Sequence, residues 1–163
     1  GITSIVRYNI VGWGSTGTGL ICRGNDEIRR NTLHANIGVE IRDTAQAVIR
    51  SNLMLVDKTR NGIGILYTGA VPYDFATASK TITIQNNAVW NVTSQTSKYA
   101  NSDGTYLPAS ADIGFPQSSG PALQGGDPFQ EFPSLTFSYV PSAGSQLLGQ
   151  GYDGEMVGAE NVP

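Results

Sequence analysis

The chain has 163 residues, which suits one domain, and its formal net charge of -3 argues against non-specific nucleic-acid binding. Only 14% of its residues are charged and 20 are glycine, a balance that favours a turn-rich β protein over a helical bundle. No apolar run approaches the roughly 18 residues of a membrane span, and the single cysteine excludes an intrachain disulfide.

The first part of the chain, residues 1–93, carries a pattern that occurs four times. In each copy an asparagine stands three positions after one apolar residue and two positions before another. The asparagines are Asn9, Asn31, Asn52 and Asn87. The apolar residues before them are Val6, Ile28, Ile49 and Ile84, and those after them are Val11, Leu33, Met54 and Val89. A second apolar segment follows each of the first three asparagines, opened by Gly19, Gly38 and Gly62.

This pattern predicts stacked coils. A spacing of 21 or 22 residues between the first three asparagines, with two or three short strands per period, suits one coil of a parallel β-helix. Neighbouring coils would lie about 4.8 Å apart, so Val6, Ile28, Ile49 and Ile84 would form one interior stack. Cys22, Ile41 and Tyr67 would form another. The asparagines are expected at bends, where this residue type tolerates a left-handed backbone and hydrogen-bonds to its copy in the next coil.

Two parts of the sequence resemble a known family. The segment IRRNTLHANIGVEI, residues 28–41, resembles the repeat of right-handed parallel β-helix proteins of the pectin-lyase-like type, and the resemblance covers residues 1–93. The closing stretch is similar to the segment that ends many secreted bacterial proteins of this kind. Its matching motifs are Asp127-Pro128, Pro141 to Ser145 and Asp153 to Ala159.

The resemblance implies an all-β solenoid of about four coils with an irregular C-terminal cap. It also implies a location outside the cell or at the cell surface. It implies no single activity, because this fold carries lyases, hydrolases, epimerases, phage tailspikes and adhesive surface proteins.

One region interrupts the repeat. Residues 67–80 lengthen the step to the fourth asparagine and are interpreted as a loop that leaves the coil. Tyr73 and Phe75 in this loop either offer an aromatic platform for a sugar or fold back over the side of the helix.

The rest of the chain, residues 94–163, is assigned to the same domain. Residues 94–126 lack the repeat and are expected to form long loops or one degenerate coil. The last stretch is expected to cap the C-terminal end of the helix. The pattern begins near residue 2, so either an upstream domain or another subunit is expected to cover the N-terminal coil.

Arginine recurs at strand positions whose side chains should point away from the core, because side chains alternate between the two faces of a strand. Stacked guanidinium groups repel one another unless anions or acidic neighbours compensate, and their planar forks suit the carboxylates and sulfates of acidic polysaccharides. The predicted binding strip consists of Arg7, Arg29, Arg50, Arg23 and Arg42. The alternative interpretation is a solvated surface, in which these arginines pair with Asp26, Glu27, Glu40 and Asp43.

Candidates for catalysis are few. His34 is the single histidine and is either a general base or a surface or turn residue. A polysaccharide lyase needs a base and a cation that neutralises the uronate, and Lys58 and Arg60 either fill these roles or form a charged turn. No metal-ligand spacing and no phosphate-loop lysine occurs, so no metal and no cofactor is expected.

Two functions are therefore predicted. The first is a β-helix module that binds or acts on acidic polysaccharide, as a polysaccharide lyase or a related enzyme if it is catalytic. The second is a structural or assembly module without catalysis, such as part of a phage tailspike or the spacer of a surface adhesin. The arginine strip favours the first function, and the missing catalytic set favours the second. No nucleic acid or membrane partner is expected, whereas formation of a homo-oligomer would cover the N-terminal coil.

Overall fold

The computed structural model describes residues 1–42, 46–56, 62–74, 81–90, 98–107, 123–124 and 139–160, and only the backbone of residues 12–16. Strands dominate these residues, and a short 3-10 helix, η2, spans Tyr152–Gly154. The expected all-β character is confirmed. The strands are β1 (Ser4–Arg7), β2 (Ile10–Cys22), β3 (Asp26–Arg29), β4 (Thr32–Ile41), β5 (Gln46–Arg50), β6 (Leu53–Val56), β7 (Ile63–Tyr67), β8 (Thr81–Gln85), β9 (Ala88–Trp90) and β10 (Tyr99–Asn101).

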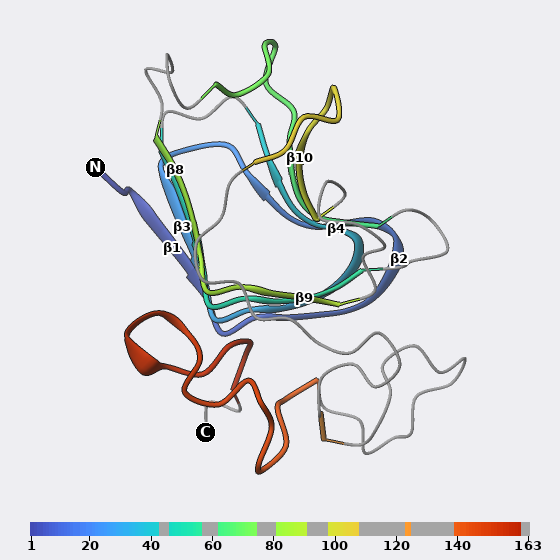
Figure 1. The fold of residues 1–163 in the computed structure, drawn as a ribbon, viewed down its shortest axis with the longest axis vertical. Helices are drawn as coiled ribbons and strands as arrows, with labels where there is room; N and C mark the ends of the chain where they lie inside the picture. Colours follow the sequence, from blue (N-terminus) through green and yellow to red (C-terminus); the bar gives the residue numbers. More distant parts are fainter. Residues whose placement is uncertain are drawn as a thin grey trace.

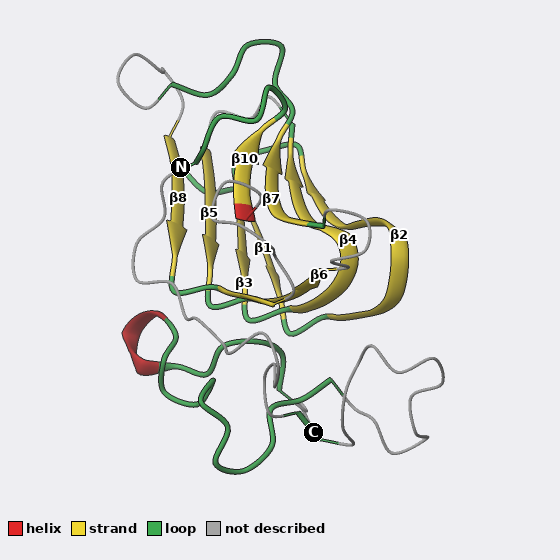
Figure 2. Ribbon diagram, turned by 45° about the vertical axis from the view of Figure 1, so that its right-hand side comes forward, coloured by secondary structure: helices red, strands yellow, loops and turns green. Residues whose placement is uncertain are grey.

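These strands form two parallel sheets. The first has the order β1-β3-β5-β8, and Figure 2 shows its strands side by side. The second has the order β10-β7-β4-β6-β9, and β2 also pairs with β4. Residues 32–35 of β4 pair with β6, whereas residues 37–41 pair with β7. The second sheet therefore bends along β4, and its concave face lies toward the first sheet (Figure 1).

The pairing defines four repeats. Repeat 1 holds β1 and β2, repeat 2 holds β3 and β4, repeat 3 holds β5, β6 and β7, and repeat 4 holds β8, β9 and β10. Each repeat adds one strand to the first sheet and then crosses to the second. Parallel neighbours of this kind require such crossings, because a hairpin would reverse the strand direction.

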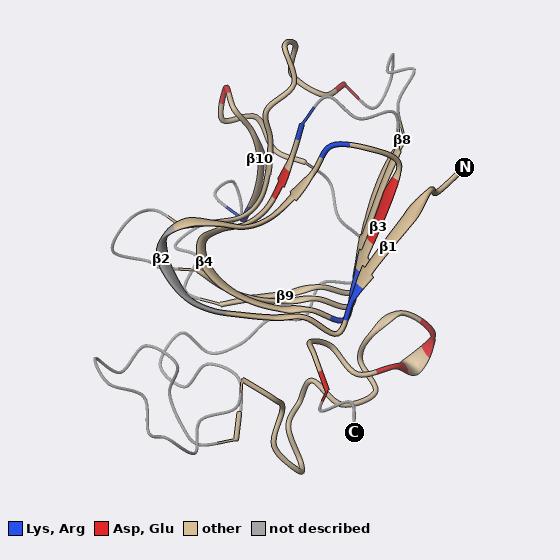
Figure 3. Ribbon diagram, turned by 180° about the vertical axis from the view of Figure 1, so that it is seen from behind, with Lys and Arg blue, Asp and Glu red and all other residues tan. Residues whose placement is uncertain are grey.

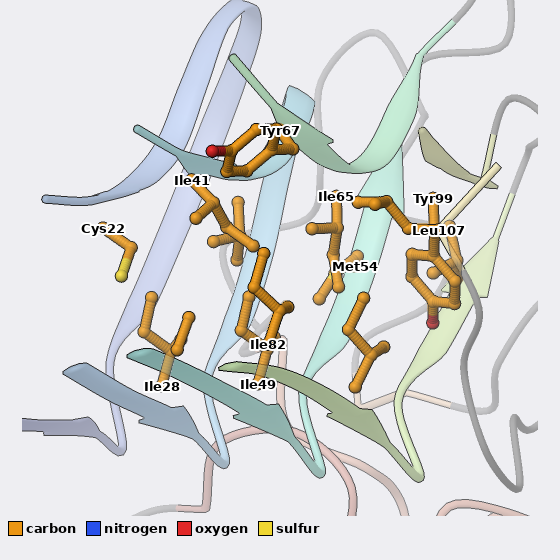
Figure 4. Packing of buried hydrophobic residues seen from close by; sticks show 14 of the residues in the cluster. Cys22, Ile28, Ile41, Ile49, Met54, Ile65, Tyr67, Ile82, Tyr99 and Leu107 are labelled. Atoms are coloured by element: carbon orange, nitrogen blue, oxygen red, sulfur yellow. The ribbon is translucent and has the colours of Figure 1, made fainter. Parts of the chain in front are cut away.

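Both predicted apolar stacks, that of Val6 and its equivalents and that of Cys22, Ile41 and Tyr67, are confirmed, and Val11 and its equivalents form a third. In register across the strands are Val6, Ile28, Ile49 and Ile84, then Val11, Leu33, Met54 and Val89, and then Cys22, Ile41 and Tyr67. They meet in one core between the sheets, part of which is drawn in Figure 4. All are buried except Val6 and Val11 of repeat 1, which are partly exposed. Burial of each such side chain contributes about 1.5–3 kcal/mol, so the core is the main stabilising feature of the fold.

The four asparagines form a continuous ladder, which we call the asparagine row. Asn9 donates from its backbone N–H and from Nδ2 to Oδ1 of Asn31, both at 3.0 Å. Asn31 donates in the same way to Asn52, at 3.1 and 3.0 Å, and Asn52 to Asn87, at 3.0 Å each. The predicted hydrogen bonding between equivalent asparagines is thus confirmed.

The left-handed backbone lies one position earlier than predicted. The residues with positive φ are those before each asparagine, namely Tyr8 (60°), Arg30 (52°), Ser51 (55°) and Asn86 (50°). Non-glycine residues rarely adopt this conformation. The asparagine itself lies one position before the next strand, and its side chain donates to the carbonyl two residues earlier, as Asn31 does to Arg29 at 2.9 Å.

Two segments decide between the alternatives predicted for the irregular regions, and Tyr73 of the insertion folds back onto the core. Tyr73 of the insertion is only 8% exposed and belongs to the core, where its ring meets the edge of Tyr67. Residues 98–107 contain β10, which pairs with β7, so the expectation of plain loop is wrong here and that of a degenerate coil is closer. Tyr99 of β10 is fully buried in the core beside Leu107.

The C-terminal stretch does not cap the end of the sheets within the described residues. Leu147 and Val157 pack instead on the outer face of β6 and β9, along the side of the molecule. This second cluster is formed by Leu53, Leu55, Ala88, Trp90, Leu123, Leu147 and Val157, with Tyr139 at its edge. Residues 139–160, orange to red in Figure 1, thus close an apolar face that the curled sheet would otherwise expose.

Candidate functional site

The predicted arginine strip begins with three residues that occupy equivalent positions in the first sheet. Arg7, Arg29 and Arg50 each end a strand, and they are register partners across β1, β3 and β5. Their backbones are therefore about 4.8 Å apart. We call these three residues the arginine row, and Figure 3 shows basic residues gathered where β1 and β3 end.

One carboxylate, that of Glu27, pairs with two members of the arginine row. Glu27 accepts hydrogen bonds from Nε of Arg50 at 2.8 Å and is 2.7 Å from a terminal nitrogen of the same guanidinium. The same oxygen lies 3.4 Å from Arg29. Arg50 also lies over the ring of Tyr152, 4.2 Å from its centroid.

Arg7 is the exposed end of the row. Its guanidinium lies 5.1 Å from the ring centroid of Tyr8, and no carboxylate of the described residues forms an ion pair with it. The row therefore has three cations and one paired anion, which leaves positive charge at the side of repeat 1.

The other two predicted arginines do not join this row. Arg23 and Arg42 follow β2 and β4, so they stand near the start of the first sheet's strands, whereas the arginine row stands at their ends. The length of β3, about 10 Å, separates the two groups. The prediction of one strip of five arginines is therefore wrong: the structure forms two separate basic groups.

Glu40 neutralises one member of the second group. It accepts from Nε of Arg42 at 2.5 Å and from the hydroxyl of Thr68 at 3.0 Å. These hydrogen bonds, with the one from Arg42 dominant, lower the pKa of Glu40 below its ordinary value. Arg23 is exposed and forms no ion pair within the described part of the chain. The alternative interpretation, a solvated surface of paired charges, is thus correct for Arg29, Arg50 and Arg42.

Two of the other predicted site residues are buried. His34 is 3% exposed, and its Nδ1 lies 2.9 Å from the hydroxyl of Tyr139. The expectation of a surface or turn residue is wrong, because the C-terminal stretch covers this side of β4. Tyr73, buried in the core, offers no ring face to a sugar. Lys58, Arg60 and Phe75 lie outside the described residues.

Sequence reasoning missed Arg30. Its guanidinium lies 2.6 Å from Glu160 and 3.7 Å from Glu155, and it donates to the Tyr8 hydroxyl at 3.2 Å. The sequence signal that separates it from Arg29 is its place directly before an asparagine, at the left-handed corner. It fastens the C-terminal stretch to repeat 2 and so serves the fold.

The side of repeat 1 away from repeat 2 has a distinct character. β1 pairs only with β3 and β2 only with β4, so among the described strands each has one unpaired edge. Large apolar side chains are exposed there. They are Ile2 (38% exposed), Ile5 (53%), Ile10 (41%) and Ile21 (44%). We call this surface, with Asn9 between its two strands, the first-repeat edge.

The described residues contain neither a metal-binding cluster nor a membrane-spanning helix. No three His, Cys, Asp or Glu side chains there form a group that could hold a metal ion. None of the helical segments in this part of the chain has the length and apolar character needed to cross a membrane. Comparison with protein-family models, with curated proteins and with solved structures found no significant match.

Proposed function

We propose that this chain is part of a right-handed parallel β-helix of the pectin-lyase-like type and serves as a structural module that assembles through its first-repeat edge. Support for the solenoid comes from the four repeats, whose strands stay in parallel register in both sheets. The right-handed sense follows the strong general preference of parallel crossovers. By resemblance, the module belongs outside the cell or at its surface.

The observation that carries the assembly function is the first-repeat edge itself. Unpaired strand edges offer backbone donors and acceptors to another chain, and stable monomers cover or charge such edges. Here four isoleucines are exposed along the edge, and the one charged residue of its two strands is Arg7, at the end of β1. Burial of one isoleucine contributes roughly 1.5–3 kcal/mol, so covering this surface is favourable.

The positions of the predicted site residues that the structure describes agree with this function. The only histidine is covered by Tyr139, and the insertion tyrosine belongs to the core. Most of the predicted binding arginines are held by carboxylates of the same chain. The described residues thus favour a scaffold over an active site.

The test is sedimentation velocity of the chain over a range of concentrations. We expect concentration-dependent association that Ile5→Lys abolishes, because a charge at the centre of the edge opposes burial. Val71→Lys is the matched control, since Val71 is 73% exposed and lies outside the first-repeat edge. A wild-type chain that stays monomeric at all concentrations, or that associates regardless of Ile5, would remove the support for assembly.

A second function, binding of acidic polysaccharide, is favoured by the charge of the arginine row. Three guanidinium groups face one carboxylate there, and Arg7 is exposed. Affinity electrophoresis in gels with neutral, uronate or sulfated polysaccharide tests it. Retention by the anionic polymers alone, weakened by Arg7→Ala, would support binding. Unsaturated products from a uronate polymer would add lyase activity, and equal mobility in all gels would exclude both.

A further inference from the structure

The asparagine row has a direction. In each link, the later asparagine accepts through Oδ1 and the earlier one donates, so every Oδ1 in the row faces toward repeat 1. Asn9 begins the row, and its Oδ1 therefore faces the open side. No described group donates to this oxygen, and Asn9 itself is exposed.

A column of stacked glycines in the second sheet limits the side chains that the first-repeat edge can accept. Gly19, Gly38 and Gly64 are equivalent residues of the second sheet. A Cβ on Gly19 would lie 2.7 Å from the carbonyl oxygen of Gly38, and one on Gly38 would lie 2.6 Å from that of Gly64. Both distances are shorter than real Cβ atoms show, so Gly19 and Gly38 must be glycine as long as the next repeat lies behind them. A residue stacked upon Gly19 would meet the same restriction.

The first-repeat edge therefore specifies its partner. We infer that it binds an extended polypeptide segment that runs parallel to β1 and β2, with an asparagine over Asn9 and a glycine over Gly19. An apolar residue three positions before that asparagine would cover Val6, which is only partly buried now. This inference rests on the proposed assembly function and names its partner.

A second copy of the chain in the same state does not fit this description. Two first-repeat edges placed face to face would bring one Asn9 Oδ1 against the other, and two acceptors form no hydrogen bond. Contact between copies would then rest on apolar burial alone. A donor-bearing segment satisfies the oxygen and buries the isoleucines as well, so it should displace self-association.

The test uses a fluorescent peptide with the sequence of residues 26–42, which carries both Asn31 and Gly38. Binding to the full chain is followed by fluorescence anisotropy. The matched controls are the same peptide with Asn31→Leu or Gly38→Ala. We expect the unchanged peptide to bind and each control peptide to bind at least tenfold more weakly. The protein variant Asn9→Ala, checked for folding by circular dichroism, should also weaken binding at least fivefold.

The outcomes separate the two proposals. Equal binding of all three peptides, no binding of any, or binding unaffected by Asn9→Ala would overturn the inferred partner. If association of the chain still depended on Ile5 in that case, the first-repeat edge would remain an assembly surface with a different partner. Loss of both effects would overturn the assembly function and the partner together.

Discussion

The asparagine row and the arginine row run side by side, two residues apart, and the same repeat produces both. The asparagine side chain carries a donor and an acceptor, so a stack of asparagines satisfies itself. The arginine side chain carries only donors and a positive charge, so a stack of arginines needs other side chains to compensate it. That compensation comes from Glu27 and from Tyr152 of the C-terminal stretch. Stacking of identical side chains therefore stabilises the fold when each can hydrogen-bond to its own copy, and destabilises it when the copies repel one another.

The largest effect should come from the middle of the asparagine row. Asn52→Ala removes the acceptor of two hydrogen bonds from Asn31 and leaves the buried carbonyls of Ile28 and Arg50 without this donor. We expect the free energy of unfolding in urea to fall by about 3–5 kcal/mol. Asn9→Ala, at the exposed end, is the control and should cost about 1 kcal/mol. Equal losses would show that the row does not act as a buried ladder.

A smaller effect is expected where the arginine row depends on its one carboxylate. Glu27→Gln keeps the shape of the side chain but removes the charge that holds Arg29 and Arg50. Because the pairs are partly exposed, the loss should be about 1 kcal/mol, and it should shrink in 1 M salt. Chemical denaturation by urea at low and high salt measures it. A loss that does not depend on salt would point to packing and not to charge.

Acid should distinguish the Glu40–Arg42 pair from the uncharged asparagine row. The pKa of Glu40 is lowered in the folded state, chiefly by its hydrogen bond from Arg42. A carboxyl with a lowered folded pKa stabilises the protein above its unfolded pKa of about 4.3, and this contribution is lost as the pH falls through the folded value. Glu40→Gln should therefore flatten the fall in stability below about pH 4, while Asn52→Ala should leave its slope unchanged. Urea denaturation between pH 7 and pH 3 tests both.

The smallest effect belongs to the exposed end of the arginine row. Arg7→Ala removes a guanidinium that contacts only the ring of Tyr8 among the aromatic and acidic side chains described. Its free energy of unfolding should stay within about 0.5 kcal/mol of the wild-type value. Thermal unfolding measures this difference. A loss as large as that of Glu27→Gln would mean that Arg7 has a structural partner.

The sequence was sufficient to predict the stacks because each depends on one residue type at a fixed spacing. Val6 and its equivalents, and the asparagines, meet their own copies, so periodicity alone places them. The burial of His34 and the docking of Arg30 depend on residues more than a hundred positions away, which no local pattern encodes. β10 was missed for a similar reason, since its pairing with β7 is set by the core around Tyr99 and not by the repeat.

The left-handed corner before each asparagine has a consequence for variation. The asparagine side chain stabilises the bend, so the position before it does not require one residue type. Tyr8, Arg30, Ser51 and Asn86 occupy this position in the four repeats. The C-terminal stretch contacts three of these corners by different means: Glu160 pairs with Arg30, Glu155 bonds Ser51, and the Gln150 carbonyl accepts from Asn86. Each of these three corner residues thus makes its own contact with the C-terminal stretch. Exchange of these residues between corners should therefore change the contacts of the C-terminal stretch and leave the asparagine row in place.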